Sequence, residues 1–173
     1  MDQNRPTVLR AILVTVGLVV LLAWAMVAIA VDDALWFLPV FVADASQIDL
    51  YWDGDHVTLL PGSSAYELLN DAVRQEFPRP LAHPSGSGLS QVSLDRLRAE
   101  GRLAEVSYDR PVRIHTTFGY GPSQVYYIPL AGHHAGLNRV FNQGRGVPLE
   151  LHSTAAIRSA AETVARDQGL GQP

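Results

Sequence analysis

Histidine is the residue type in this chain whose side chain is best suited to catalysis or metal binding. The sequence contains 6 histidines and no cysteine, and His115, His133, His134 and His152 fall in its β-rich C-terminal half. Neutral imidazole is a common zinc ligand. The spacing does not favour a metal centre, because adjacent residues of an extended chain point to opposite faces and neither H-x-x-x-H nor H-E-x-x-H occurs. We therefore expect no metal and no other cofactor, and a polar turn at His133-His134.

Arg113 and three of the histidines form an alternative site that the sequence leaves open. Arg113 precedes His115 by two residues in a predicted strand, and His133 and His134 follow in a turn flanked by glycines. A buried cleft that joined these four residues would make the chain an exported domain that binds a small ligand or a metal, or a hydrolase. Without such convergence, the histidines are polar residues of a turn and of a half-buried sheet.

Nucleophilic catalysis has little support in the sequence. The absence of cysteine excludes thiolate nucleophiles and disulfides, and all 13 basic residues are arginine, which excludes lysine chemistry. No G-x-S-x-G motif occurs, and the glycine-rich segments 119–121 and 144–146 are not followed by the helix that a phosphate-binding loop requires. We expect no catalytic residues, and we interpret both glycine segments as hairpin turns.

Tyr126 and Tyr127 are candidates for contact with a partner protein. They are adjacent in a predicted strand, so their rings point to opposite faces and at least one is expected to be exposed. An exposed tyrosine beside Arg113 or Arg139 would suit a protein interface. Packing in the core or across strands is the alternative for both tyrosines.

An uncharged apolar run from Ala11 to Val31 determines where these residues lie relative to the cell. At about 1.5 Å per residue the run is roughly 30 Å long, which is the thickness of a bilayer core. Arginines precede the run, and basic flanks stay on the cytoplasmic side. Asp32 and Asp33 follow the run, and we expect them to stop the helix rather than to act as catalytic acids. We expect residues 1–10 in the cytoplasm, residues 11–31 as a single transmembrane helix, and the C-terminal domain outside the cytoplasm. The protein is then located in the cell membrane.

Two alternatives to this membrane anchor remain. Ala28 and Ala30 form an A-x-A pattern, so the run is compatible with a signal peptide that is cleaved after Ala30. The run is longer than a typical signal-peptide core of about 7 to 15 residues and contains Trp24, which favours the anchor. A buried core helix would normally show a polar stripe, and this run is almost uniformly apolar.

A second apolar stretch, residues 35–43, follows the two aspartates within a juxtamembrane segment, residues 32–46. It is too short to span a bilayer. Its aromatic residues Trp36, Phe37 and Phe41 suit the headgroup region, where an aromatic ring has both an apolar and a wet side. We expect these three residues to contact the membrane or a partner, and packing of the stretch on the domain is the alternative.

Residues 47–168 have the pattern of a small α+β domain, followed by a polar tail, residues 169–173. Asp53-Gly54 lies between two β-rich runs, 48–52 and 56–60, which is a strong hairpin signal. The patterns further predict a helix over 64–77 capped by Ser63 or Ser64, a helix from Ser90 or Ser93 to Glu100, and a helix over 154–168 capped by Ser153 or Thr154. One apolar face is expected on the first helix (Tyr66, Leu69, Ala72, Val73 and Phe77) and one on the last (Ile157, Ala160, Ala161 and Val164). Strands are predicted over 103–108, 112–118, 124–130, 138–142 and 147–152, and a loop over 78–88. This order favours a mostly antiparallel sheet with two or three helices packed on one face.

These features favour an interaction protein over an enzyme. We expect a single-pass membrane-anchored protein whose extracytoplasmic domain binds a partner as an accessory subunit, assembly factor or sensor of a membrane complex. Residues 44–173 contain 11 Arg and 14 Asp or Glu, so the domain lacks the basic surface that nucleic-acid binding requires. The expected partners are the lipid bilayer and another membrane or envelope protein, and no nucleic acid.

Overall fold

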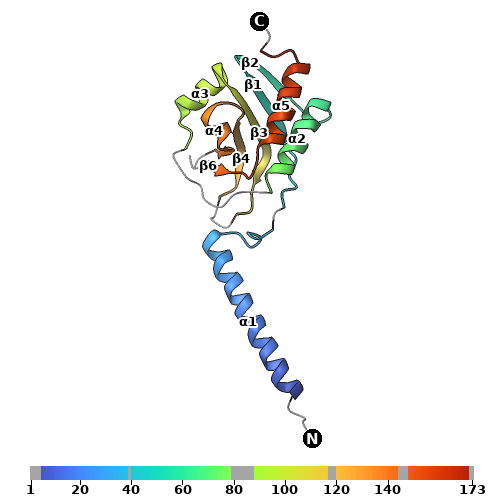
Figure 1. Cartoon of the computed structure of the whole chain (residues 1–173), viewed down its shortest axis with the longest axis vertical. Helices are drawn as coiled ribbons and strands as arrows, with labels where there is room; N and C mark the ends of the chain where they lie inside the picture. Colours follow the sequence, from blue (N-terminus) through green and yellow to red (C-terminus); the bar gives the residue numbers. More distant parts are fainter. Residues whose placement is uncertain (1–4, 39, 79–87, 117–119, 144–147, 172–173) are drawn as a thin grey trace.

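A computed structural model describes residues 5–38, 40–78, 88–116, 120–143 and 148–171 (Figure 1). A long helix, α1 (Arg5–Val31), projects from a body that is built of a sheet and shorter helices. Within α1, the segment Val8–Val31 is 24 residues long. An 18-residue stretch of this segment has a mean hydropathy of 2.8, and no residue of that stretch is buried. By length and composition α1 is therefore able to span a membrane. It ends at Val31, where the predicted apolar run ends.

A six-stranded sheet with the order β2-β1-β3-β4-β5-β6 forms the centre of the body, and all neighbouring strands are antiparallel. The strands are β1 (Gln47–Trp52), β2 (Asp55–Leu59), β3 (Arg102–Val112), β4 (Ser123–Pro129), β5 (Arg139–Asn142) and β6 (Pro148–Glu150). The helices are segregated from the strands rather than alternating with them, which makes this an α+β fold. The predicted fold class is confirmed.

The hairpin of β1 and β2 follows directly from its turn residues. Asp53 and Gly54 connect the strands with φ angles of 50° and 96°. A two-residue turn with positive φ at both positions matches the twist of a hairpin, and Asp-Gly adopts it at low cost. Nε of Arg102 donates to both carboxylate oxygens of Asp53, at 3.1 and 3.0 Å, which holds the turn against β3. The predicted hairpin is confirmed.

Serine hydroxyls define where two of the helices begin. Ser63 accepts a hydrogen bond from the backbone N–H of Tyr66 at 3.2 Å at the start of α2 (Ser64–Glu76). Ser90 accepts one from the N–H of Ser93 at 3.1 Å at the start of α3 (Gln91–Glu100). Such caps satisfy N–H groups that have no partner within the helix. Both helices were predicted with these residue types at their N-termini.

The core lies between the first face of the sheet and the helices α2 and α5 (Ala155–Asp167), which pack against each other (Figure 1). Residues that alternate along β1, β3 and β4 supply the sheet side of this core. The fully or almost fully buried members are Ile48, Leu50, Ala104, Val106, Tyr126 and Ile128 from the sheet, with Leu69, Val73, Ile157 and Ala161 from the two helices. The apolar faces predicted for α2 and α5 are the faces that are buried.

The second face of the sheet carries Asp49, Glu105 and Tyr127, which lie opposite one another on neighbouring strands. The helix α3 lies over this face, because Nη2 of Arg98 donates to Glu105 at 2.9 Å. A short helix, α4 (Gly132–Gly136), lies on the same side, where the ring of His134 contacts Phe141. The helices therefore cover both faces of the sheet, rather than the single face that was predicted.

Two predicted elements differ from the structure. The strand β3 continues through Asp109-Arg110-Pro111, which was predicted to be a turn, because the pairing of β3 with β4 shifts register between Ser107 and Val112. Proline is tolerated at such irregularities, where its missing N–H costs no ladder hydrogen bond. Of the strand predicted over 112–118, residues 113–116 have no regular structure and 117–118 lie outside the described residues.

The polar turn predicted at His133-His134 is the helix α4. Its five residues are too few for the helical pattern to be recognised in the sequence. The predicted loop 78–88, apart from its ends, and most of the predicted glycine turns 119–121 and 144–146 fall outside the described residues.

Candidate functional site

The end of α1 has a defined geometry that turns the chain sharply after Val31. Asp32 has a positive φ of 54°. The N–H of Asp32 donates to the carbonyl of Ile29 at 3.4 Å, and the N–H of Asp33 donates to that of Ala28 at 3.0 Å. This pair of bonds is the Schellman motif, in which a left-handed residue stops the helix, and aspartate tolerates that conformation better than most residues. The sequence predicted the two aspartates as a helix stop, and this is confirmed.

Arg113 joins the domain to the end of α1. Its guanidinium donates to the backbone carbonyl of Asp32, and Nη2 lies 3.1 Å from Oδ2 of the same residue. The C-terminus of a helix carries a partial negative charge, so a cation at this place is favourable. The Arg113 side chain is 25% exposed and that of Asp32 is 93% exposed, so solvent surrounds the carboxylate of this ion pair more than its guanidinium.

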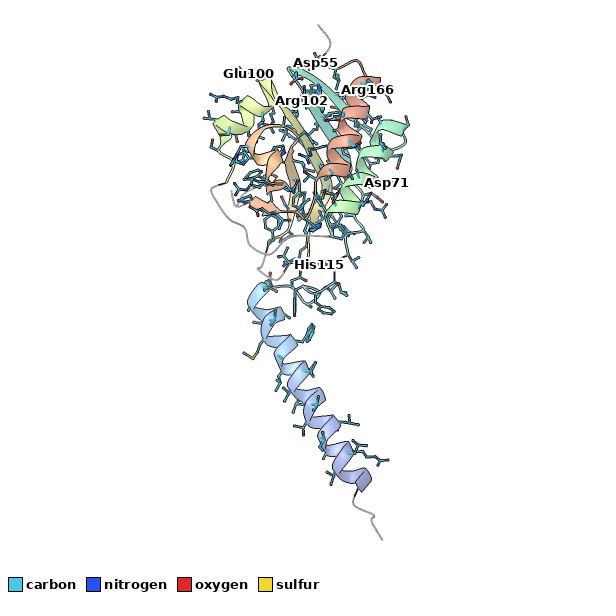
Figure 2. The ribbon with its side chains drawn as sticks, viewed as in Figure 1. Asp55, Asp71, Glu100, Arg102, His115 and Arg166 are labelled. Carbon is cyan, nitrogen blue, oxygen red and sulfur yellow. The ribbon has the colours of Figure 1, made fainter. Side chains whose placement is uncertain are left out.

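His115 makes the second link, to a carboxylate that is almost fully buried. Asp33 is 8% exposed, and Nδ1 of His115 lies 2.8 and 3.1 Å from its two carboxylate oxygens. The backbone N–H of Leu35 also donates to Oδ1 of Asp33, at 2.9 Å. An ionised carboxylate only accepts hydrogen bonds, so Nδ1 carries the proton in this contact. We call Asp32, Asp33, Arg113 and His115 the junction cluster, and Figure 2 shows His115 at the end of the domain nearest α1.

The chain after Asp33 folds back beside α1. Nε1 of Trp24, which lies about two turns before the helix end, donates to the carbonyl of Ala34 at 3.1 Å. A turn follows, in which the N–H of Leu38 donates to the carbonyl of Leu35 at 2.8 Å. Leu35, Phe37, Val40 and Val42 are large apolar residues that remain exposed in this segment. Exposed apolar side chains gathered at one place on a protein typically mark a contact with another protein or a membrane.

A groove of about 560 Å³ lies between this segment and the end of β3. One wall is apolar and is lined by Leu35, Leu38 and residues 40–43, and the other is lined by residues 110–113 and His115. Among the described residues that line the groove, Arg110 and Arg113 are charged and none is acidic. We call this cavity the junction groove. Its size is in the range of small-molecule binding sites.

The three aromatic residues predicted near the membrane have different environments. Trp36 and Phe37 lie in the turn beside α1, with their rings 5.6 Å apart. Phe41 is only 6% exposed and packs edge-on against Phe77 and Tyr108 in the core. The predicted membrane or partner contact of Phe41 is therefore wrong, because its ring is needed to fill the domain core. The alternative of packing on the domain holds for this end of the stretch.

The two tyrosines predicted as partner contacts lie on opposite faces of the sheet, as alternation requires. Tyr126 is fully buried, and its hydroxyl donates to the carbonyl of Val112 at 3.0 Å. It cannot contact a partner, so this prediction is corrected to a core role. Tyr127 is half-buried on the second face, where Arg98 lies 6.0 Å from the centre of its ring.

The predicted ligand site of four residues is divided in the structure. Arg113 and His115 lie together in the junction cluster, whereas His133 and His134 belong to α4 and His134 lines a separate pocket with residues of α3. Burial, together with the nearby charge of Arg139, lowers the pKa of His134. Within the described ranges, no group of three or more histidine, aspartate or glutamate side chains is placed to hold a metal ion.

The second face of the sheet carries a further polar cluster that the sequence analysis missed. The carboxylate of Asp49 accepts hydrogen bonds from Gln47 at 2.6 Å and Thr58 at 2.6 Å, and lies 3.1 Å from Nε2 of His56. The His56 ring stacks on Tyr51 at 4.5 Å. Alternation in the predicted hairpin would have placed these residues on one face, so a signal was present. The links of Arg113 and His115 to Asp32 and Asp33 had no comparable signal.

Comparisons of this chain with protein-family models, with curated protein sequences and with solved structures found no match. The functional proposal therefore rests on the geometry of the junction cluster and its surroundings.

Proposed function

We propose that this chain is a single-pass membrane protein with a cytoplasmic N-terminus, and that its domain acts outside the cytoplasm as an accessory subunit, assembly factor or sensor of a membrane complex. The exposure of most side chains of α1 supports a lipid or protein environment for this helix. Arg5 and Arg10 at one end and Asp32 and Asp33 at the other support the orientation.

The single observation that carries the proposal is that α1 is bonded to the residues after it. Trp24 donates to Ala34, and the carbonyls of Ala28 and Ile29 accept from Asp33 and Asp32. Cleavage after Ala30 would separate the partners of all three hydrogen bonds. The geometry is thus better suited to a permanent anchor than to a signal peptide that is removed.

The exposed apolar residues beside α1 support a partner at the same place. Phe37 is about half exposed and lies in the turn that follows α1, a helix that would itself be within the membrane. A membrane protein that contacts both α1 and Phe37 would bury apolar surface on either side of the membrane boundary. The division of the histidines between two places gives less support to an exported ligand-binding domain or hydrolase.

Extraction of the full-length protein in a mild detergent tests this proposal. We expect an intact mass that includes residues 1–30 and a membrane protein that co-purifies in stoichiometric amount. Phe37→Ser should reduce the yield of that partner, whereas Val92→Ser, which changes an exposed apolar residue of α3, should not. A chain that begins at Val31 would contradict the anchor, and loss of the partner only with Val92→Ser would place the interface on α3.

A further inference from the structure

We propose that the junction groove binds the phosphate headgroup of an anionic phospholipid from the bilayer leaflet in which α1 ends. This inference rests on the proposed membrane anchoring, and it assigns a ligand to the groove itself. Three properties of the groove favour this ligand: its level relative to the membrane, the charge of its lining and the division between polar and apolar walls.

The position of the groove follows from covalent and ionic links to α1. Arg113 lines the groove and binds the carbonyl and the carboxylate of Asp32, the first residue after the helix. The Val8–Val31 segment has the length of a bilayer core, so Asp32 falls at the level of the lipid headgroups. The groove consequently opens where phosphate groups are present at high local concentration.

The charge of the lining is complementary to an anion. Arg110 and Arg113 are the charged side chains among the described residues of the lining. Arg113 and His115 are engaged with Asp32 and Asp33. Arg110 is exposed and has no ion pair with any residue in the described part of the chain. Its guanidinium is therefore available for the paired hydrogen bonds that arginine makes to phosphate.

The apolar wall distinguishes a lipid from a free anion. Leu35, Leu38, Val40 and Val42 line the side of the groove that belongs to the segment beside α1. A site for inorganic phosphate would gain nothing from such a wall, whereas the glycerol and upper acyl region of a phospholipid would cover it. Near a membrane surface each arginine contributes about 1 kcal/mol to the binding of anionic lipid.

Titration of the purified full-length protein in detergent micelles with dioleoylphosphatidylglycerol tests this inference. We expect saturable binding, measured by native mass spectrometry, and we expect Arg110→Gln to weaken it about fivefold. Arg166→Gln is the matched control, because Arg166 is an exposed arginine at the end of the domain far from α1 (Figure 2). It should bind like the unchanged protein.

The remaining outcomes separate the possible sources of phosphate. Dioleoylphosphatidylcholine should bind more weakly, and inorganic phosphate at millimolar concentration should not displace the anionic lipid. Equal weakening by Arg110→Gln and Arg166→Gln would overturn the site, and displacement by inorganic phosphate would overturn the lipid as its ligand. Either result would leave the anchoring proposal intact, because that proposal is tested by the retained N-terminus.

Discussion

At the scale of single residues, the burial of Asp33 makes His115 important for stability. Asp33 would keep only its hydrogen bond from the N–H of Leu35 without His115, and removing one partner of a buried polar group costs about 1–3 kcal/mol. We expect His115→Ala to lower the free energy of unfolding by this amount. The measurement is urea unfolding of the full-length protein in detergent, followed by tryptophan fluorescence.

The matched control for His115 is His56→Ala. His56 also pairs with an aspartate, but its side chain is 44% exposed, compared with 20% for His115, so solvent screens the pair. Asp49 also keeps its hydrogen bonds from Gln47 and Thr58 when His56 is removed. We expect His56→Ala to cost less than about 1 kcal/mol. An equal cost for both variants would contradict the role assigned to the buried carboxylate.

His134 gives the protein a pH dependence with a definite sign. Burial lowers the pKa of His134 in the folded protein, so the unfolded chain binds the proton more readily. The contribution of His134 to the free energy of unfolding is therefore fully present above the pKa of the unfolded chain, about 6.5, and decreases as the pH falls below that value. We expect His134→Gln to lose less stability between pH 7.5 and pH 5.5 than the unchanged protein, measured by urea unfolding at each pH.

His133 provides the control for this pH dependence, because it is the exposed neighbour of His134 in α4. The charge of His133 is the smallest of the three causes that lower the pKa of His134, so His133→Gln should change the slope of stability against pH less than His134→Gln does. A reduced slope in this variant, with no change in the His134 variant, would show that burial of the ring is not the cause.

At the scale of elements, the hairpin of β1 and β2 depends on one glycine. Gly54 has φ of 96°, a conformation that residues with a Cβ rarely adopt. We expect Gly54→Ala to destabilise the domain by about 1 kcal/mol. Gly136→Ala is the control, because Gly136 lies in α4, has no neighbour within 4 Å of an added Cβ, and does not have a positive φ. It should be neutral or slightly stabilising, and urea unfolding compares the two variants.

The elements of this protein were predictable where their signals are local. A capping serine, an Asp-Gly turn and a long apolar run act on neighbouring residues, so α2, α3, the hairpin and α1 follow from the sequence. The continuation of β3 through Pro111 was not predictable in this way. It depends on the register with β4, which involves residues more than ten positions away.

At the scale of the whole molecule, the orientation of α1 can be tested directly because the natural chain has no cysteine. We expect Asp71→Cys, on the exposed side of α2, to react with a membrane-impermeant maleimide in intact cells (Figure 2). Thr7→Cys, at the beginning of α1, should react only after the membrane has been opened. The reverse pattern would contradict the proposed topology, and labelling of both residues in intact cells would contradict a spanning helix.

Local patterns in the sequence were enough to predict the apolar helix, the α+β class and the candidate functional residues. Which of those residues come together depends on the packing of the elements. Arg113 and His115 pair with Asp32 and Asp33 across 81 and 82 positions, while His133 and His134 lie elsewhere. Likewise, alternation separated Tyr126 from Tyr127 without showing which of them is buried. Local patterns fix conformation over a few residues, whereas contacts between distant segments depend on how all the elements pack, and a single sequence does not carry that information in any local pattern.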